Sequence, residues 1–294
     1  MVKNYKVSKT PELLEGVKML NNYSVIILDL WGVVHDGINP YPGVIETMQK
    51  LKSLGKNIIL LSNSPRRSKA VIDQIEKIGI PELTYDNIIT SGELIFNYLN
   101  ELAKKSGVKN FYKVAPKGKD YLTDCLIDRE IDDINRADYI LLIGPRNDES
   151  DNVSDYESLL GFALSKSLKL VCANPDLSVL RGEKYVLCAG AIAKKYQDMG
   201  GEVIMLGKPF KQAYSCCLSL FNNYKLEDFV AIGDSPLTDI KGANQSGIDS
   251  VFILNGVHKR DIIRDSVLSY ELLEDLFRKN NIDFPTAFMN HFKW

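Results

Sequence analysis

Several polar residues that can do chemistry stand at or just beyond the ends of apolar stretches: Asp29, Ser62, Lys208, Asp234 and Asp239. Carboxylates crowded into one crevice need a cation, and magnesium (Mg2+) suits them because a hard divalent ion prefers carboxylate and water oxygens. With the ion bound, Asp29 can attack an electrophilic phosphorus while Lys208 and Ser62 offset charge on the transferred group. The pattern favours phosphoryl transfer through a phosphoaspartate that water hydrolyses.

Parallel strands would bring these residues together, and the sequence alternates strand and helix patterns. Short apolar runs predict buried strands over residues 24–28, 57–61, 202–206, 229–233 and 250–254. Helical patterns follow over residues 43–54, 68–78 and 211–221. Such alternation favours an α/β fold with a doubly wound, Rossmann-like parallel sheet, whose ligands collect beyond the carboxyl ends of the strands. The polar residues should therefore converge on one crevice.

The chain length of 294 residues predicts two domains, or one domain with a large insertion. From about residue 93 to residue 188 the strand and helix patterns recur less regularly, which indicates a second, smaller α/β unit. The first pattern returns from residue 189. Ahead of the first strand, Thr10, Pro11 and Glu12 predict the N-cap and first turn of an amphipathic helix.

Composition gives no sign of a polyanionic or membrane partner. The formal net charge is −2 and the pI is near 6.0, so we expect no nucleic-acid and no membrane partner. The polar first ten residues and the lack of a membrane-length apolar segment favour a cytoplasmic location. The five cysteines show neither metal-ligand spacing nor a disulfide framework. The aromatic tail, with Phe288, Phe292 and Trp294, could pack at the interface of a homo-oligomer.

Four segments resemble, in order, the motifs of haloacid dehalogenase (HAD) superfamily hydrolases. They read DLWGVVHDG at 29–37, LSNS at 61–64, GKP at 207–209 and GDSPLTDIKGAN at 233–244. The segment between the second and third motifs, with ANPD at 173–176, looks like the cap arrangement of class IIA, which is para-nitrophenylphosphatase-like. The resemblance implies a HAD-like core domain over residues 1–92 and 189–294, and an α/β cap domain over residues 93–188 that selects the substrate.

The resemblance also implies the metal half of the site. Asp29 would be both the nucleophile and a magnesium ligand, and the backbone carbonyl of Trp31 would be a second ligand. Asp234 would bind the ion as well. Asp239 would be a further ligand or would support the others.

The same resemblance implies a phosphate-binding half. Ser62, with the backbone at Asn63, would bind the phosphoryl group, and Lys208 would steady that group and the nucleophile. Asn174 and Asp176 would lie on or near the cap loop that faces the substrate.

Trp31 departs from the phosphatase pattern, which carries a second aspartate at this position as general acid and base. Indole has no ionisable proton near neutral pH, so Trp31 cannot act in that way. Such catalysis typically contributes about 10²- to 10⁴-fold. His35 or Asp36, in the segment expected to flank the site, could supply the proton, or the leaving group could be acidic enough to need none. Trp31 itself could fill space or form a substrate wall.

Three functions stay open at this stage. The first is a Mg2+-dependent phosphohydrolase that acts on a small phosphorylated metabolite. The second is a phosphate-ligand binding or regulatory protein with little turnover, a reading that Trp31 favours. The third is hydrolysis at carbon in the dehalogenase manner, which the metal and phosphate residues Ser62, Lys208 and Asp234 disfavour.

Overall fold

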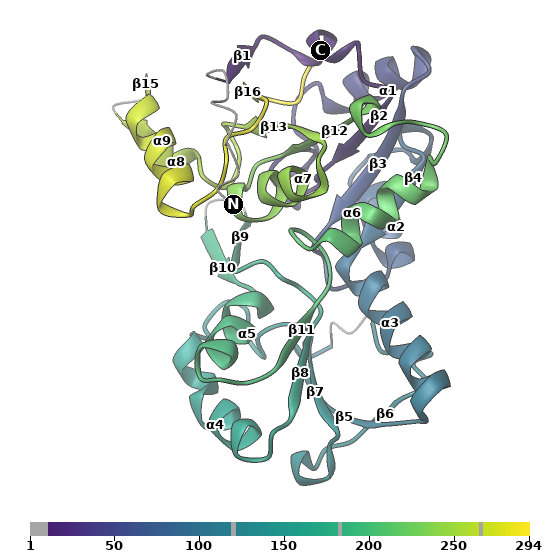
Figure 1. Cartoon of the computed structure of the whole chain (residues 1–294), viewed down its shortest axis with the longest axis vertical. Helices are drawn as coiled ribbons and strands as arrows, with labels where there is room; N and C mark the ends of the chain where they lie inside the picture. Colours follow the sequence, from purple (N-terminus) through teal and green to yellow (C-terminus); the bar gives the residue numbers. More distant parts are fainter. Residues whose placement is uncertain (1–10, 119–121, 182–183, 265–266) are drawn as a thin grey trace, which may run out of the picture.

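The computed structural model describes residues 11–118, 122–181, 184–264 and 267–294, and it contains two parallel sheets, one above the other in Figure 1. The larger sheet has seven strands, all parallel to their neighbours. In spatial order they are β1 (Glu12–Leu14), β16 (Ala287–Met289), β13 (Asp249–Ile253), β12 (Phe229–Gly233), β2 (Val25–Leu28), β3 (Asn57–Ser62) and β4 (Asn87–Thr90).

Helices cover both faces of this sheet, so its central strands are buried on both sides and read as continuous apolar runs. Because side chains alternate along a strand, Ile26 and Leu28 of β2 enter one core cluster while Val25 and Ile27 enter the other. The first cluster is covered by α1 (Val44–Ser53) and α2 (Ser68–Lys77), and the second by α6 (Lys211–Leu220) and α7 (Lys241–Ser246). This two-sided burial holds the strand ends in place.

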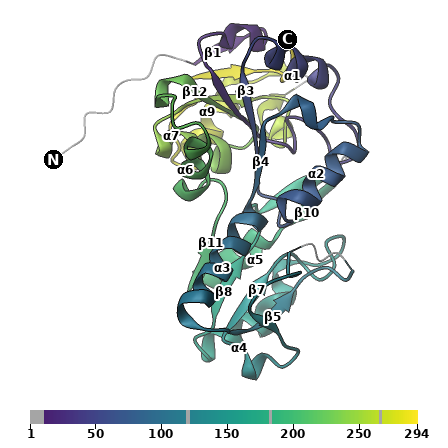
Figure 2. The same ribbon diagram turned by 90° about the vertical axis from the view of Figure 1, so that its right-hand side faces the viewer.

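The smaller sheet has five parallel strands. In spatial order they are β11 (Val203–Met205), β8 (Lys169–Cys172), β7 (Tyr139–Leu142), β5 (Asn110–Val114) and β6 (Arg129–Glu130). One face packs on α4 (Glu157–Ser165) and α5 (Ala189–Asp198), and the other on α3 (Ser91–Ser106), which runs down from the larger sheet in Figure 2. The strand and helix alternation predicted for the second unit is therefore present.

The smaller sheet extends further along the chain than the sequence pattern indicated. We predicted a return to the first domain at residue 189. In the structure, Ile192 and Tyr196 of α5 pack into the core of the smaller sheet, and Val203–Met205 of β11 pair with β8. The physical reason is that α5 and β11 form a crossover unit whose apolar face fits this sheet.

The predicted N-terminal helix is wrong over its described residues. Residues 12–14 form strand β1, which pairs with β16 near the other end of the chain, and Val17–Leu20 form only a 3-10 turn, η1. A partner more than 270 positions away in a chain of 294 overrides the local helical pattern. Thr10, the predicted N-cap, lies outside the described residues.

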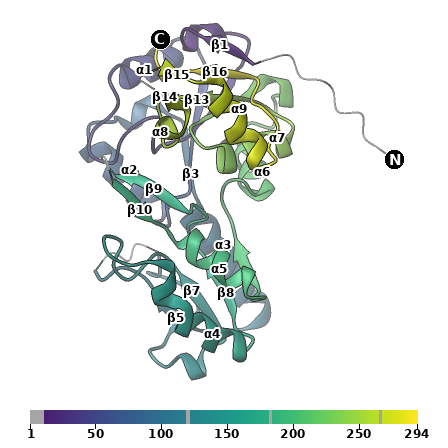
Figure 3. The same cartoon turned by 90° about the vertical axis from the view of Figure 1, so that its left-hand side faces the viewer.

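The remaining elements connect or cover the two sheets. An antiparallel hairpin, β9 (Ser178–Arg181) and β10 (Lys184–Leu187), lies between the sheets in Figure 3. The others are η2 (Glu82–Thr84), η3 (Ile134–Arg136), η4 (Val153–Tyr156), η5 (Leu226–Asp228), the π-helical turn η6 (Pro236–Ile240), α8 (Lys259–Ile262), β14 (Ile263–Arg264), β15 (Val267–Leu268) and α9 (Tyr270–Lys279). In the described part of the chain, no helix has the length and apolar character that a membrane span requires.

The aromatic tail packs mainly within its own chain. Phe288 and Phe292 are buried, and only Trp294 is exposed. Phe288 lies in a cluster with Phe252 of β13 and Phe277 of α9. The tail thus supplies strand β16, which lies between β1 and β13 in the larger sheet. Its role in a homo-oligomer stays a prediction.

Phe277→Ala tests this cluster. Phe277 is fully buried and packs edge-on against Phe252, with ring centroids 5.4 Å apart. Because the variant leaves a cavity, we expect it to lower the free energy of unfolding by about 3–5 kcal/mol. Urea unfolding followed by circular dichroism measures this loss. Val267→Ala, at an exposed position, is the control, and an equal effect of the two substitutions would contradict the packing described here.

Candidate active site

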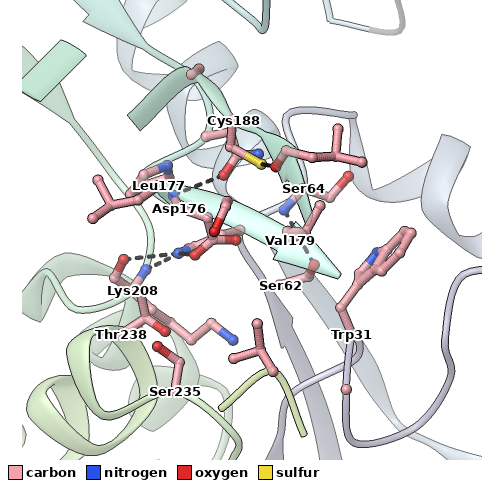
Figure 4. Close-up of a pocket in the computed structure, with 18 of the residues that line it drawn as sticks. Trp31, Ser62, Ser64, Asp176, Leu177, Val179, Cys188, Lys208, Ser235 and Thr238 are labelled. Atoms are coloured by element: carbon pink, nitrogen blue, oxygen red, sulfur yellow. Dashed lines mark hydrogen bonds between the residues drawn. The ribbon is translucent and has the colours of Figure 1, made fainter. Parts of the chain in front are cut away.

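A cavity of about 830 Å³ lies where the carboxyl ends of the two sheets face each other. The larger sheet contributes Asp29 after β2 and Asp234 after β12, and the smaller sheet contributes Ile143 after β7. The β9–β10 hairpin forms a further wall, with Val179 and Leu177 near Ser62 and Lys208 in Figure 4. The predicted crevice beyond the strand ends is thus formed by both sheets together.

Lys208, which follows β11, lies at the centre of a buried charged cluster. Its Nζ donates hydrogen bonds to Asp29 Oδ1 and, at 2.8 Å, to Asp239 Oδ1. Only 3% of Lys208 and 8% of Asp29 are exposed. Asp234 completes the cluster, because one ligand atom from each of the three carboxylates lies within 4.8 Å of the others. The structure therefore brings these four predicted residues together.

The cluster contains three carboxyl groups and one ammonium group. Burial raises the pKa of Asp29 well above its usual range, and Lys208 opposes this shift while Asp239 and Asp234 add to it. Burial, followed by the charge of Asp239, raises the pKa of Asp234 to about 7. Burial alone would lower the pKa of Lys208, but Asp239 and Asp29 outweigh it and raise that pKa. A cation beside the carboxylates would relieve this repulsion.

The hydrogen bonds distinguish the three carboxylates as metal ligands. Asp239 uses both oxygens within the protein, since Oδ1 accepts from Lys208 and Oδ2 accepts from the Ser235 backbone N–H at 3.2 Å. Within the described residues, Asp29 Oδ2 and Asp234 Oδ1 accept no hydrogen bond from the protein. Asp234 Oδ1 and the carboxylate of Asp29 can therefore hold a divalent ion, while Asp29 Oδ2 stays open to the cavity and Asp239 holds Lys208.

Ser62 and Asn63 follow β3 and line the same cavity. The Ser62 hydroxyl accepts a hydrogen bond from the Ser64 N–H at 3.2 Å and can still donate its own proton to a ligand. The Asn63 side chain has different partners: its Oδ1 accepts from the Lys208 N–H at 2.7 Å, and its Nδ2 donates to Lys208 O and to Asp176. Only the backbone at Asn63 remains available for the phosphate-binding role that we predicted.

Trp31 forms part of the cavity wall, and its ring packs against a glycine in the same loop. Gly37 has a φ of +92°, and a Cβ there would lie 2.3 Å from the Trp31 ring, so the loop accommodates the indole only with glycine at this position. A packed aromatic ring thus occupies the position at which we expected a catalytic acid from the sequence motif.

His35 and Asp36 do not line the cavity, in contrast to the prediction that one of them supplies a proton. His35 is 1% exposed and lies behind Trp31 in an edge-on ring contact. Its Nδ1 accepts from the Gly37 N–H, and burial lowers its pKa to about 4, so the ring is neutral near pH 7. Asp36 Oδ1 accepts from the N–H groups of Ile38 and Asn39. Both side chains instead stabilise the loop.

Asn174 and Asp176 line the cavity from the loop after β8. Asn174 Oδ1 accepts from the Asp176 N–H at 2.9 Å, which shapes the loop. Sequence reasoning missed the adjacent hairpin residues Val179, Arg181 and Tyr185, which also line the cavity. The runs SVLR and KYVL, lying close together in the sequence, were the available signal for a hairpin.

Comparisons with known proteins identify the family of this chain. A model of haloacid dehalogenase-like hydrolases matches residues 26–125, and a HAD-hydrolase-like model matches residues 205–276. The crystal structure of a hydrolase of the haloacid dehalogenase-like family from Brucella suis 1330 is 31% identical, with a TM-score of 0.81. That match covers 95% of this chain and 99% of the Brucella chain. This chain belongs to the haloacid dehalogenase-like hydrolase family.

Other relatives of this HAD hydrolase are more distant. The 4-nitrophenylphosphatase of Schizosaccharomyces pombe is 24% identical over 268 residues, which cover 85% of this chain and 89% of the relative. The crystal structure of a possible sugar phosphatase of the HAD superfamily from Cytophaga hutchinsonii is 19% identical, with a TM-score of 0.78 over 97% of this chain and 99% of its own. The predicted fold class, a Rossmann-like parallel core with a second α/β unit, is confirmed.

The buried His35 predicts a pH dependence of stability. Its pKa falls from 6.5 in the unfolded chain to about 4 in the folded HAD hydrolase. The unfolded chain therefore binds a proton between these values that the folded chain excludes, so stability falls as the pH falls through this window. From these two pKa values, His35 should lower the free energy of unfolding by about 2 kcal/mol at pH 5 relative to pH 7.5.

Urea unfolding of the parent and of His35→Asn at pH 7.5 and pH 5 measures this contribution. The asparagine can still accept a hydrogen bond from Gly37 but does not titrate, so the variant should lose less stability than the parent between the two pH values. Equal losses would mean that His35 does not have the lowered pKa described above.

Proposed function

We propose that this HAD hydrolase is a Mg2+-dependent phosphohydrolase that acts on a small phosphorylated metabolite through an aspartyl-phosphate on Asp29. The observation that carries the proposal is the buried cluster in which Lys208 holds one oxygen of Asp29 and leaves the other open to the cavity. The names of the relatives support it, since one is a 4-nitrophenylphosphatase and another a ribonucleotide monophosphatase.

In the proposed reaction, Asp29 Oδ2 attacks phosphorus, and the bond between phosphorus and the leaving oxygen breaks. Lys208 orients Asp29 and offsets charge on the transferred group, and the Ser62 hydroxyl donates to a phosphoryl oxygen. A magnesium ion held by Asp29, Asp234 and the Trp31 carbonyl would supply further charge compensation. Water then hydrolyses the aspartyl-phosphate and releases phosphate.

The leaving group must depart without a proton from residue 31, because Trp31 has none to give. His35 and Asp36 are held by hydrogen bonds within the loop, and we assign them a structural role. This arrangement favours substrates with acidic leaving groups, such as acyl or aryl phosphates. The same observation favours the second candidate, a phosphate-binding or regulatory protein with little turnover.

We also propose a division into core and cap that follows the sheets. The larger sheet and its helices would form the catalytic core, and residues from α3 through β11 would form a class IIA cap over it. The support is that the five-stranded sheet, its helices and the β9–β10 hairpin lie together on the carboxyl side of the larger sheet. The Trp31 variant of the first motif would then mark a subgroup within this class.

Asp29→Asn tests the nucleophile. An amide is a poor nucleophile, so turnover of para-nitrophenyl phosphate with Mg2+ should fall by about 10³-fold or more. Treatment of the parent with EDTA should abolish turnover, and added Mg2+ should restore it. Phosphate release measures both effects. Persistent activity of Asp29→Asn would exclude the mechanism.

Trp31→Asp tests the missing acid. It places a carboxyl group where a leaving oxygen can be protonated, so turnover of alkyl phosphates should rise by about 10²- to 10⁴-fold, with little change for acetyl phosphate. Trp31→Phe keeps an aromatic ring and is the matched control. If only Trp31→Asp turns over any phosphate, the parent is better described as a phosphate-binding protein.

A further inference from the structure

One amide joins the cap loop to the catalytic lysine. Asn63 Nδ2 donates at 2.8 Å to Asp176 Oδ1 and at 2.9 Å to Lys208 O, while its Oδ1 accepts from the Lys208 N–H. Asn63 is almost fully buried, so all its side-chain hydrogen-bonding groups are used within the protein. We call this arrangement of Asp176, Asn63 and Lys208 the Asn63 link, and Figure 4 shows Asp176 beside Lys208.

The turn that carries Lys208 is packed directly against the Asn63 amide. Gly207 has a φ of +120°, and a Cβ there would lie 2.6 Å from Asn63 Oδ1. Little space therefore separates the amide from the turn, and a shift of Asn63 must be transmitted to the backbone of Lys208.

The cap side of the Asn63 link is equally constrained. The Asp176 carbonyl accepts from the Gly190 N–H at 3.1 Å, and the Asp176 N–H donates to Asn174. Next to this loop, buried Ser91 donates its hydroxyl proton to Ala173 O at 2.6 Å. Hydrogen bonds to neighbouring residues therefore hold the Asp176 backbone in place.

A second contact joins the hairpin to the metal-binding carboxylate. Tyr185 Oη, on β10, donates to Val257 O at 2.9 Å, and the Val257 N–H donates to Asp234 Oδ2 at 2.7 Å. Tyr185 is 48% exposed, and within the described residues its hydroxyl makes this one hydrogen bond. We call this arrangement of Tyr185, Val257 and Asp234 the Tyr185 link.

We propose that the position of the cap controls the placement of Lys208 and Asp234 through these two links, with Asn63, Asp176 and Tyr185 as positioning residues. The inference rests on the proposed phosphohydrolase function. With the cap in the position seen here, both links are made and both catalytic groups are held. If the cap moves away, the Asn63 amide loses the Asp176 carboxyl group as an acceptor, and the Val257 carbonyl loses the Tyr185 hydroxyl as a donor. Lys208 and Asp234 are then held less firmly.

Asp176→Ala and Asp176→Asn separate this positioning role from the charge of Asp176. Alanine removes the acceptor for Asn63, so kcat for para-nitrophenyl phosphate should fall by about 10- to 100-fold with a smaller change in KM. Asparagine keeps an oxygen acceptor and should restore kcat to within about fivefold of the parent. Tyr185→Phe should lower kcat by about two- to tenfold, whereas Tyr270→Phe, at an exposed position on α9, should match the parent.

Hydrogen exchange provides a readout that does not depend on turnover. The Lys208 amide is bonded to Asn63 and should exchange faster in Asp176→Ala than in the parent, but not in Asp176→Asn. Parent-like exchange and kcat in Asp176→Ala would overturn the proposal, and so would equal losses in the two Asp176 variants. If the parent hydrolyses no phosphate, the proposed function fails, yet faster exchange in Asp176→Ala alone would still support the Asn63 link.

Discussion

The site depends on one buried ammonium group. Lys208 is shared between Asp29 and Asp239, with Asp234 close by, and all four side chains are nearly inaccessible to water. Removing Lys208 would leave its buried carboxylate partners uncompensated, at a cost of several kcal/mol. The cluster therefore requires fixed relative positions of the elements that carry it. These are the ends of β2, β11 and β12 and the π-helical turn that carries Asp239. The helices that bury both faces of the larger sheet provide that rigidity.

The second constraint is the way in which the two sheets face each other. Each is parallel, so each presents the carboxyl ends of its strands along one edge, and the cavity lies between these edges. The larger sheet and its connections supply the carboxylates Asp29, Asp234 and Asp239, while Lys208 follows β11 of the smaller sheet. Asn63 connects the two parts through hydrogen bonds to Asp176 and Lys208. Tyr185 connects them through Val257, whose N–H donates to Asp234.

Trp31 affects the expected proton transfer to the leaving group, and it does not affect the expected attack of Asp29 on phosphorus. Its ring is built into the loop, since Gly37 makes room for it and His35 packs edge-on behind it. Several residues of the loop are thus adapted to an indole at the position where the sequence motif predicted an acid. Asp29, Lys208 and Asp234, which we propose as the nucleophile, its lysine and a metal ligand, lie together in the buried cluster.

The α/β fold and the convergence of four polar residues could be predicted from the sequence, because apolar runs that end in polar residues specify strand ends locally. These residues are Asp29, Ser62, Lys208 and Asp234. The tertiary structure alone decided the rest, since each remaining feature depends on partners far away in the chain. Strand β1 exists because β16 pairs with it, and α5 with β11 joins the smaller sheet because of its packing there. Likewise the partners of Asn63 lie 113 and 145 positions away, a separation that no local pattern encodes.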